Sequence, residues 1–238
     1  MGFAQSWQVF VQALKTSYDK LGRVMLTNLL WFGVGFAPFL LVTYLPLKSE
    51  LFFLAGIVAT IFTLGGATAA LHHVINGIIT GEDSSVRDFW AGFKKFFGRG
   101  SILVLLGILG FSLLFFNIWS GAASTSKIVF FLVGFWVWGV IYWYSLLQYV
   151  FPLLTQQNAK LLLILKRAAL ITLDNILASF LLGIVSLIVI VLSIILAAPL
   201  LIFTASFLAL LQNYSLNEIM TKYQGEDSDP DPSVENKE

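Results

Sequence analysis

The chain has 238 residues, of which 58% are hydrophobic and only 11% carry a formal charge. Soluble domains average about 25% charged residues, so this composition excludes an ordinary water-soluble fold. The net charge of +1 says little about partners, and the absence of cysteine excludes disulfides and thiolate chemistry.

Residues 1–23 are predicted to form an amphipathic helix that lies in the plane of the membrane surface. Trp7, Phe10 and Leu14 follow helical spacing on one side, and polar or charged side chains occupy the other. This segment is the first predicted unit of the chain, and residues 24–222 are predicted to form one membrane domain.

Long uncharged stretches in residues 24–222 predict membrane-spanning helices. The last stretch, residues 175–217, would run about 65 Å as one helix, roughly twice the thickness of the hydrocarbon core. We expect it to break before Pro199, because proline suits the first turn of a new helix. The sequence therefore predicts six spans, at about 25–46, 51–73, 101–119, 128–151, 176–197 and 199–216.

Lysine and arginine are distributed unequally between the two sides of these spans. Twelve of the 14 fall on the side of the termini, and only Lys48 and Lys127 fall on the other. Because basic loops stay in the cytoplasm, both termini are predicted to be cytoplasmic.

Residues 86–99 are predicted to form a second in-plane helix, with rings in the acyl boundary and cations beside anionic head groups. Basic residues interleaved with aromatics can also bind nucleic acid, but stacking on bases needs exposed rings. We therefore expect lipid contact and no nucleic acid. The residues expected at the lipid interface are Trp7, Phe10, Leu14, Phe89, Trp90, Phe93, Lys94, Lys95, Phe96, Phe97 and Arg99.

A third amphipathic stretch, residues 160–174, suggests an internal repeat. Gly22-Arg23, Gly98-Arg99 and Asp174-Asn175 end the three stretches at a common spacing. The predicted fold is all-α, with six transmembrane helices in three hairpin repeats, each preceded by a cytoplasmic-side interfacial helix. The acidic, proline-containing residues 223–238 are predicted to be a disordered tail.

The first part of the chain resembles a known family. The residues NLLW (28–31), Pro38, GGATAAL (65–71) and DFWAGFKKFF (88–97) are similar to the YesL-like family of largely uncharacterised bacterial integral membrane proteins. The resemblance is clearest over residues 20–115. The resemblance implies a location in the bacterial cytoplasmic membrane, an accessory role and an association with ABC-type carbohydrate uptake. It implies no catalytic residues. His72-His73 stands where an aromatic is expected.

The search for reactive groups gives little. The predicted spans contain no Asp, Glu, Lys or Arg, so proton coupling through a buried carboxylate is not expected. Adjacent His72 and His73 point about 100° apart on a helix and cannot share one metal as an i, i+4 pair would. We expect no enzyme activity, metal site or cofactor.

Several uncharged residues are candidates for contact with a partner or ligand. Packing, lipid anchoring and ligand binding all remain open for them, including ring stacking on a sugar in residues 128–151. These candidates are Asn28, Trp31, His72, His73, Asn76, Trp138 and Tyr142.

Two functional hypotheses follow. The first is a non-catalytic accessory or scaffold subunit that binds a membrane-protein partner or forms a homo-oligomer. The alternative is a small stand-alone transporter or channel for an uncharged solute. Its route would be lined by residues such as Asn28, Thr63, Asn76, Asn117 and Gln148.

Overall fold

The structure is a computed structural model that describes residues 2–45, 49–196 and 199–226. Every element within these ranges is helical. The α-helices are α1 (Phe3–Asp19), α2 (Leu21–Tyr44), α3 (Glu50–Thr80), α4 (Val86–Ala122), α5 (Lys127–Gln157), α6 (Leu161–Asp174), α7 (Ile176–Leu196) and α8 (Ala205–Glu226). A π-helical turn, η1 (Leu200–Thr204), leads into α8.

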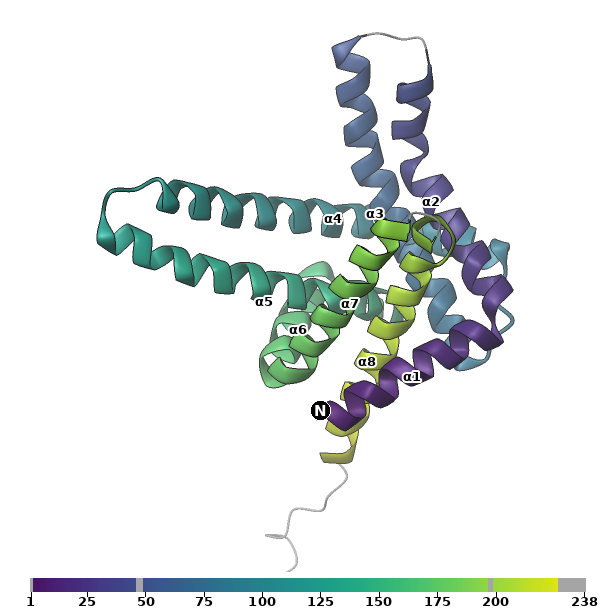
Figure 1. Ribbon diagram of the computed structural model, residues 1–238. Helices are drawn as coiled ribbons and strands as arrows, with labels where there is room; N and C mark the ends of the chain where they lie inside the picture. Colours follow the sequence, from purple (N-terminus) through teal and green to yellow (C-terminus); the bar gives the residue numbers. More distant parts are fainter. Residues whose placement is uncertain (1, 46–48, 197–198, 227–238) are drawn as a thin grey trace, which may run out of the picture.

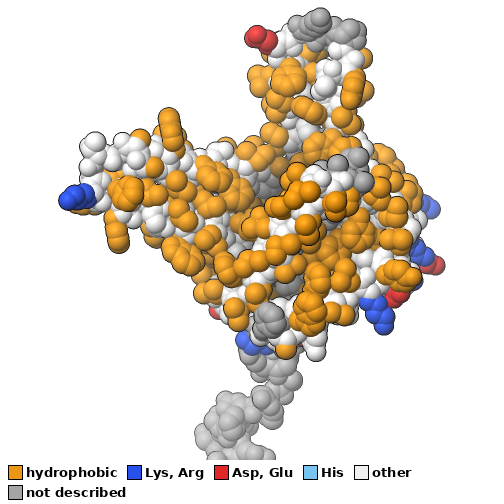
Figure 2. Space-filling model, in the orientation of Figure 1, with side chains coloured by type: hydrophobic (Ala, Val, Ile, Leu, Met, Phe, Trp, Pro, Cys, Tyr) orange, Lys and Arg blue, Asp and Glu red, His pale blue; other side chains and the backbone are white. Residues whose placement is uncertain are grey.

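Five helices, namely α2, α3, α4, α5 and α7, are long and apolar enough to cross a membrane. The chain is therefore a multi-pass membrane protein by the length and composition of its helices. In Figure 1, α2 and α3 form one hairpin, and α4 and α5 form another that leaves the body in a different direction. Figure 2 shows hydrophobic side chains over both hairpins, with most of the visible charge at their tips and at the edges of the body.

The predicted sixth span, residues 199–216, is not among these five apolar helices. Its larger part is the start of α8, which is buried between other helices and contacts α1, α2, α3, α5 and α7. Leu210, Leu211, Leu216 and Ile219 lie in the core, but so do the polar Ser206 and Asn213. Burial against protein, rather than against lipid, explains how this helix carries so many polar groups.

The acidic tail differs from its predicted limits. Helix α8 continues to Glu226, past the predicted boundary at residue 223. Residues 227–238, which hold most of the predicted tail, lie outside the described residues, as do Ala197 and Ala198 at the predicted break.

The predicted in-plane helix 86–99 is not a separate element. Residues 86–122 form one continuous helix, α4, whereas α1 and α6 are separate helices before α2 and α7. Gly98 and Gly100 do not end the helix, since a glycine inside a helix costs only about 1 kcal/mol relative to alanine. In the second unit, therefore, no separate helix precedes the α4–α5 hairpin within the described residues.

Glycines set the distance between α3 and α4. A Cβ built on Gly100 would lie 2.3 Å from the carbonyl oxygen of Gly65, and one built on Gly65 would lie 2.5 Å from that of Gly100. The two backbones thus touch at this crossing. The Ser101 hydroxyl, beside the contact, is 2.7 Å from the carbonyl oxygen of Phe62 on α3. Small residues such as Gly65 in GGATAAL allow this close approach of two helices.

Candidate functional site

The expected lipid-facing side of α1 lies on the outside of the protein. Trp7 and Leu14 are exposed, while Val9 and Ala13 are buried on the other side. Phe10 lies at the border and packs edge-on against Phe207 of α8, with ring centroids 6.1 Å apart. The rest of the protein therefore covers only part of the apolar side of α1, and Trp7 and Leu14 remain exposed.

The aromatic side of residues 86–99 lies differently from the prediction. Phe89 and Phe96 are completely buried in the protein core instead of facing lipid. Phe93 and Phe97 lie against Gly66, where a Cβ would approach their rings within 2.9 Å and 2.7 Å. Because Gly66 has no side chain, these two rings can approach α3 closely. Of this aromatic set, Trp90 and Phe97 keep substantial exposure.

The cations of this segment divide into two groups. Lys94 and Lys95 are exposed, and the Lys95 ammonium lies 4.9 Å from the centroid of the Phe96 ring. Arg99 instead donates to Asn158, with its Nη2 2.6 Å from the Asn158 Oδ1. It also donates to the backbone oxygens of Asn158 and Ala159, where α5 ends. Arg99 therefore fastens α4 to the α5–α6 connection.

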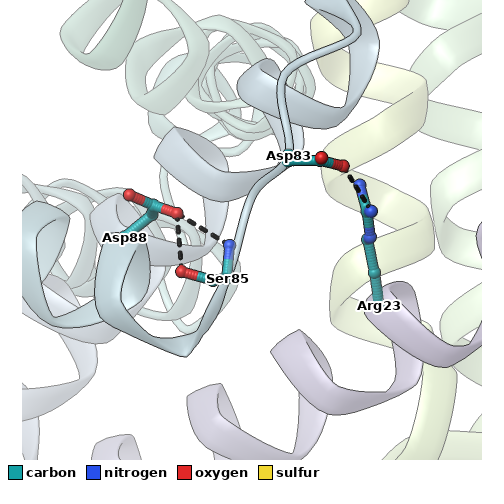
Figure 3. A network of polar contacts seen from close by, with 4 residues as sticks. All are labelled: Arg23, Asp83, Ser85 and Asp88. Carbon is teal, nitrogen blue, oxygen red and sulfur yellow. Dashed lines mark hydrogen bonds and ion pairs between the residues drawn. The ribbon is translucent and has the colours of Figure 1, made fainter.

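A polar contact joins the start of α2 to the α3–α4 loop (Figure 3). Arg23 Nη2 lies 2.6 Å from Asp83 Oδ1. Beside it, Asp88 Oδ2 accepts from the Ser85 backbone N–H at 2.7 Å and from the Ser85 hydroxyl at 2.9 Å, which caps α4. The ion pair therefore shows that the start of α2 lies beside the loop between α3 and α4.

The structure brings two of the seven candidate contact residues, Trp31 and His72, to one pocket, and Asn28 lies one helical turn before Trp31. Asn28 accepts a hydrogen bond from the backbone N–H of Ser206 at 3.0 Å, which holds α2 against the start of α8. Trp31, one turn further along α2, and His72 of α3 line the same pocket. Trp31 donates its indole N–H to the Thr68 hydroxyl at 3.0 Å.

The other four candidates lie elsewhere. His73 packs edge-on against Phe96, with ring centroids 5.8 Å apart. Tyr142 donates to the backbone oxygen of Ala169 at 3.3 Å. Asn76 is half-buried and Trp138 is exposed. Because His72 and His73 face different neighbours, they form no joint site.

The pocket between α2, α3, α7, η1 and α8 has a volume of about 260 Å³, close to the lower limit of roughly 300 Å³ for small-molecule sites. It combines an aromatic ring, apolar side chains and uncharged polar groups. Its lining residues are Trp31, Thr68, Leu71, His72, Ile190, Thr204, Ala205, Leu208 and Gln212. Noncovalent binding is the chemistry that such a lining supports.

A buried polar network lies directly behind the pocket. Asn213 of α8 places its Nδ2 2.9 Å from His72 Nδ1 and 2.7 Å from the backbone oxygen of Ala209. Gln156 of α5 donates to Asn213 Oδ1 at 3.1 Å and to Asn217 Oδ1 at 3.0 Å. These bonds join α3, α5 and α8, and so fix one wall of the pocket.

A second amide pair lies next to this network. Gln212, which lines the pocket, donates its Nε2 to Gln148 Oε1 of α5. Two other polar residues considered for a solute route are elsewhere: Thr63 donates to the Gly35 backbone oxygen at 2.8 Å, and Asn117 donates within its own helix to Leu113. The structure therefore does not assemble all these residues along one path.

Four residues of the pocket and its network, Gln212, Asn213, Thr68 and Thr204, are absent from the candidates predicted from the sequence. For Gln212 and Asn213 a signal was available, since adjacent amides in an otherwise apolar helix must find partners when buried. Their partners on α3 and α5 depend on how α8 inserts, which no local pattern shows.

The described residues contain no cluster of three or more His, Asp or Glu side chains that could hold a metal ion. No curated protein and no solved structure matches the chain. Residues 24–118, about two-fifths of the chain, match the model of a family described as "Protein of unknown function, DUF624". The chain is thus similar to this family over α2, α3 and most of α4, the part that contributes Trp31 and His72 to the pocket.

Proposed function

We propose that the chain crosses a bacterial cytoplasmic membrane six times, as three hairpin units, with both termini in the cytoplasm. In this arrangement α8 provides the sixth crossing and is shielded from lipid by its neighbours. The Arg23–Asp83 contact supports placing the start of α2 and the α3–α4 loop on the same side of the membrane. The topology with 12 basic residues on the cytoplasmic side and two on the other requires this placement. Membership of the YesL-like family is part of this proposal and is compatible with the family match at residues 24–118.

Reporter fusions test this topology. Phosphatase fused after residue 48 or 124 should be active, because these positions would lie outside the cytoplasm. Fusions after residues 83 and 222 should be inactive as phosphatase and active as a cytoplasmic fluorescent reporter. An active phosphatase after residue 222 would show that α8 does not cross.

Exposed lysines support contact with anionic lipid. Lys94 and Lys95 lie on the exposed side of α4, near its proposed cytoplasmic end. Each basic residue near an anionic membrane surface contributes about 1 kcal/mol to its attraction. We propose that these two lysines bind head groups, while Arg99 serves mainly to hold α4 against the α5–α6 connection.

The function that the structure supports best is that of a non-catalytic accessory or scaffold subunit. One observation carries this proposal: the α4–α5 hairpin extends from the body with only its own two helices side by side (Figure 1). Trp119, Phe131 and Trp138 in this part are 72%, 83% and 69% exposed. Lipid can cover these faces, but it supplies none of the close helix packing that fixes a hairpin's direction.

Helices of a partner would supply that packing. A membrane complex such as an ABC-type carbohydrate uptake system is one candidate partner, on the basis of the YesL-like resemblance. The other candidate partner is a second copy of the chain. The mass of the crosslinked product distinguishes these two partners. The proposed contact surface is the outer half of the α4–α5 hairpin.

Photo-crosslinking in native membranes tests this surface. A photoreactive residue replacing Phe131 should give a discrete crosslinked protein band. The matched control replaces Ile195 of α7, which is 72% exposed and outside the hairpin, and should crosslink only to lipid. A band of twice the monomer mass would identify a homo-oligomer. Lipid adducts alone from position 131 would contradict the scaffold proposal.

Transport of an uncharged solute is the second candidate function. The pocket beside Trp31 and His72 favours it, because its lining has uncharged polar groups within a membrane domain. Saturable solute flux in proteoliposomes that contain only this chain would favour this function over the scaffold role.

A further inference from the structure

The orientation of the Asn213 side chain is fixed by its neighbours. The Ala209 backbone oxygen can only accept a hydrogen bond, so the atom 2.7 Å from it must be the amide nitrogen of Asn213. The amide oxygen on the other side accepts from Gln156. The second N–H of the same nitrogen is then directed to His72 Nδ1, 2.9 Å away.

This orientation determines the protonation of His72. Since Asn213 donates to Nδ1, that nitrogen must be an unprotonated acceptor. A neutral imidazole then carries its hydrogen on Nε2. A doubly protonated ring would place two donors against each other. His72 is therefore held as a neutral ring with an N–H donor at Nε2.

The His72 donor is available to the pocket. The side chain is only 3% exposed, and its Nε2 has no hydrogen-bond partner among residues 2–45, 49–196 and 199–226. Phe151 stacks on the ring at 5.7 Å, with the two planes 14° apart, which restricts its rotation. With Nδ1 turned to Asn213 and His72 lining the pocket, Nε2 is the nitrogen left to meet a ligand.

Gln212 supplies a complementary acceptor. Its Nε2 donates to Gln148, and its Oε1 has no partner among the residues that the structure describes. The Thr68 hydroxyl, in contrast, already accepts from Trp31 and donates to the Leu64 backbone oxygen. The lining thus offers a donor and an acceptor beside the apolar surface of Trp31, Leu71 and Leu208.

We propose that this pocket binds a small uncharged molecule that has a hydroxyl group on an apolar body. The ligand's oxygen accepts from His72 Nε2, its O–H donates to Gln212 Oε1, and its apolar part packs on Trp31. An ion is disfavoured because no residue of opposite formal charge lines the pocket, and an unpaired charge is costly to desolvate. The proposal rests on neither proposed function, since a scaffold or a transporter could hold the same ligand.

Nitrogen NMR tests the proposal in the full chain, reconstituted in lipid nanodiscs with ¹⁵N-labelled histidine. The protein has two histidines, so a His73→Gln variant assigns the His72 signals. Without a probe, His72 should show an unprotonated Nδ1 and a protonated Nε2. The opposite tautomer, or a doubly protonated ring at neutral pH, would overturn the proposal.

Cyclohexanol is the probe, and methylcyclohexane is its control because it lacks the oxygen. Cyclohexanol should shift the His72 Nε2 signal saturably, whereas methylcyclohexane and cyclohexylammonium should not. Gln212→Met should weaken cyclohexanol binding about three- to tenfold, as expected for one net hydrogen bond. Asn117→Leu, outside the pocket, should leave it unchanged. A shift that does not saturate, or that methylcyclohexane reproduces, would refute the site, even if the Gln212 variant fails to fold.

Discussion

Replacing Gly100 with leucine should remove most of the folded protein. The new Cβ would lie 2.3 Å from the Gly65 carbonyl oxygen and 2.9 Å from its carbon, and backbone atoms cannot move aside as a side chain can. Overpacking in a well-packed core costs about 1–3 kcal/mol and occasionally more, and we expect the upper end here. Thermal unfolding in mild detergent, followed by circular dichroism and size exclusion, measures the loss.

Gly98→Leu is the matched control for this substitution. It lies two residues away in the same helix, and nothing is within 4 Å of its added Cβ. It should keep the melting temperature close to that of the unchanged protein. Gly65→Leu, on the other side of the crossing, should be as damaging as Gly100→Leu. Equal behaviour of the Gly98 and Gly100 variants would show that α3 and α4 do not touch there.

Asn213→Leu should produce the second large loss of stability. The substitution removes the buried donors to His72 and to the Ala209 backbone oxygen, and the acceptor of the half-buried Gln156. Each buried group that loses its partner costs about 1–3 kcal/mol, so the total should reach roughly 3 kcal/mol or more. The same thermal unfolding measurement, or urea unfolding in micelles, would detect it.

Asn117→Leu is the control for Asn213→Leu. The Asn117 side chain is half-buried and donates to Leu113 of its own helix, at 2.7 Å. Because this bond joins no second helix, an apolar residue here should leave stability unchanged or raise it. If both variants unfolded at the same temperature, the buried network would not hold α3, α5 and α8 together.

The hydropathy of the sequence predicts the five apolar helices well, because a membrane-spanning helix needs about 20 apolar residues in its own sequence. Helical periodicity likewise predicts α1 and α6 as separate amphipathic helices. Small residues such as those of GGATAAL allow helices to approach closely, and Gly65 and Gly100 make such a contact. These properties are local, so one segment is enough to reveal them.

The predicted site is recovered only in part. Trp31 and His72 meet at the pocket, but Gln212 completes the lining and Asn213 binds His72 from a helix more than 130 residues later in the chain. The pairing depends on α8 lying between the hairpins. Sequence spacing does not specify that insertion, since the partners of α8 come from helices with unrelated local patterns.

The sequence by itself determined which residues of the chain are helical and which sides of those helices are apolar. Only the tertiary structure decided what covers each apolar side. The rings of Trp7 and Phe89 are both apolar, yet Trp7 stays exposed and Phe89 is completely buried. A ring leaves water equally well for lipid or for a protein groove, so amphipathicity cannot choose between them. For α4 the choice depends on its packing against α3, where Gly65 and Gly100 let the two backbones touch.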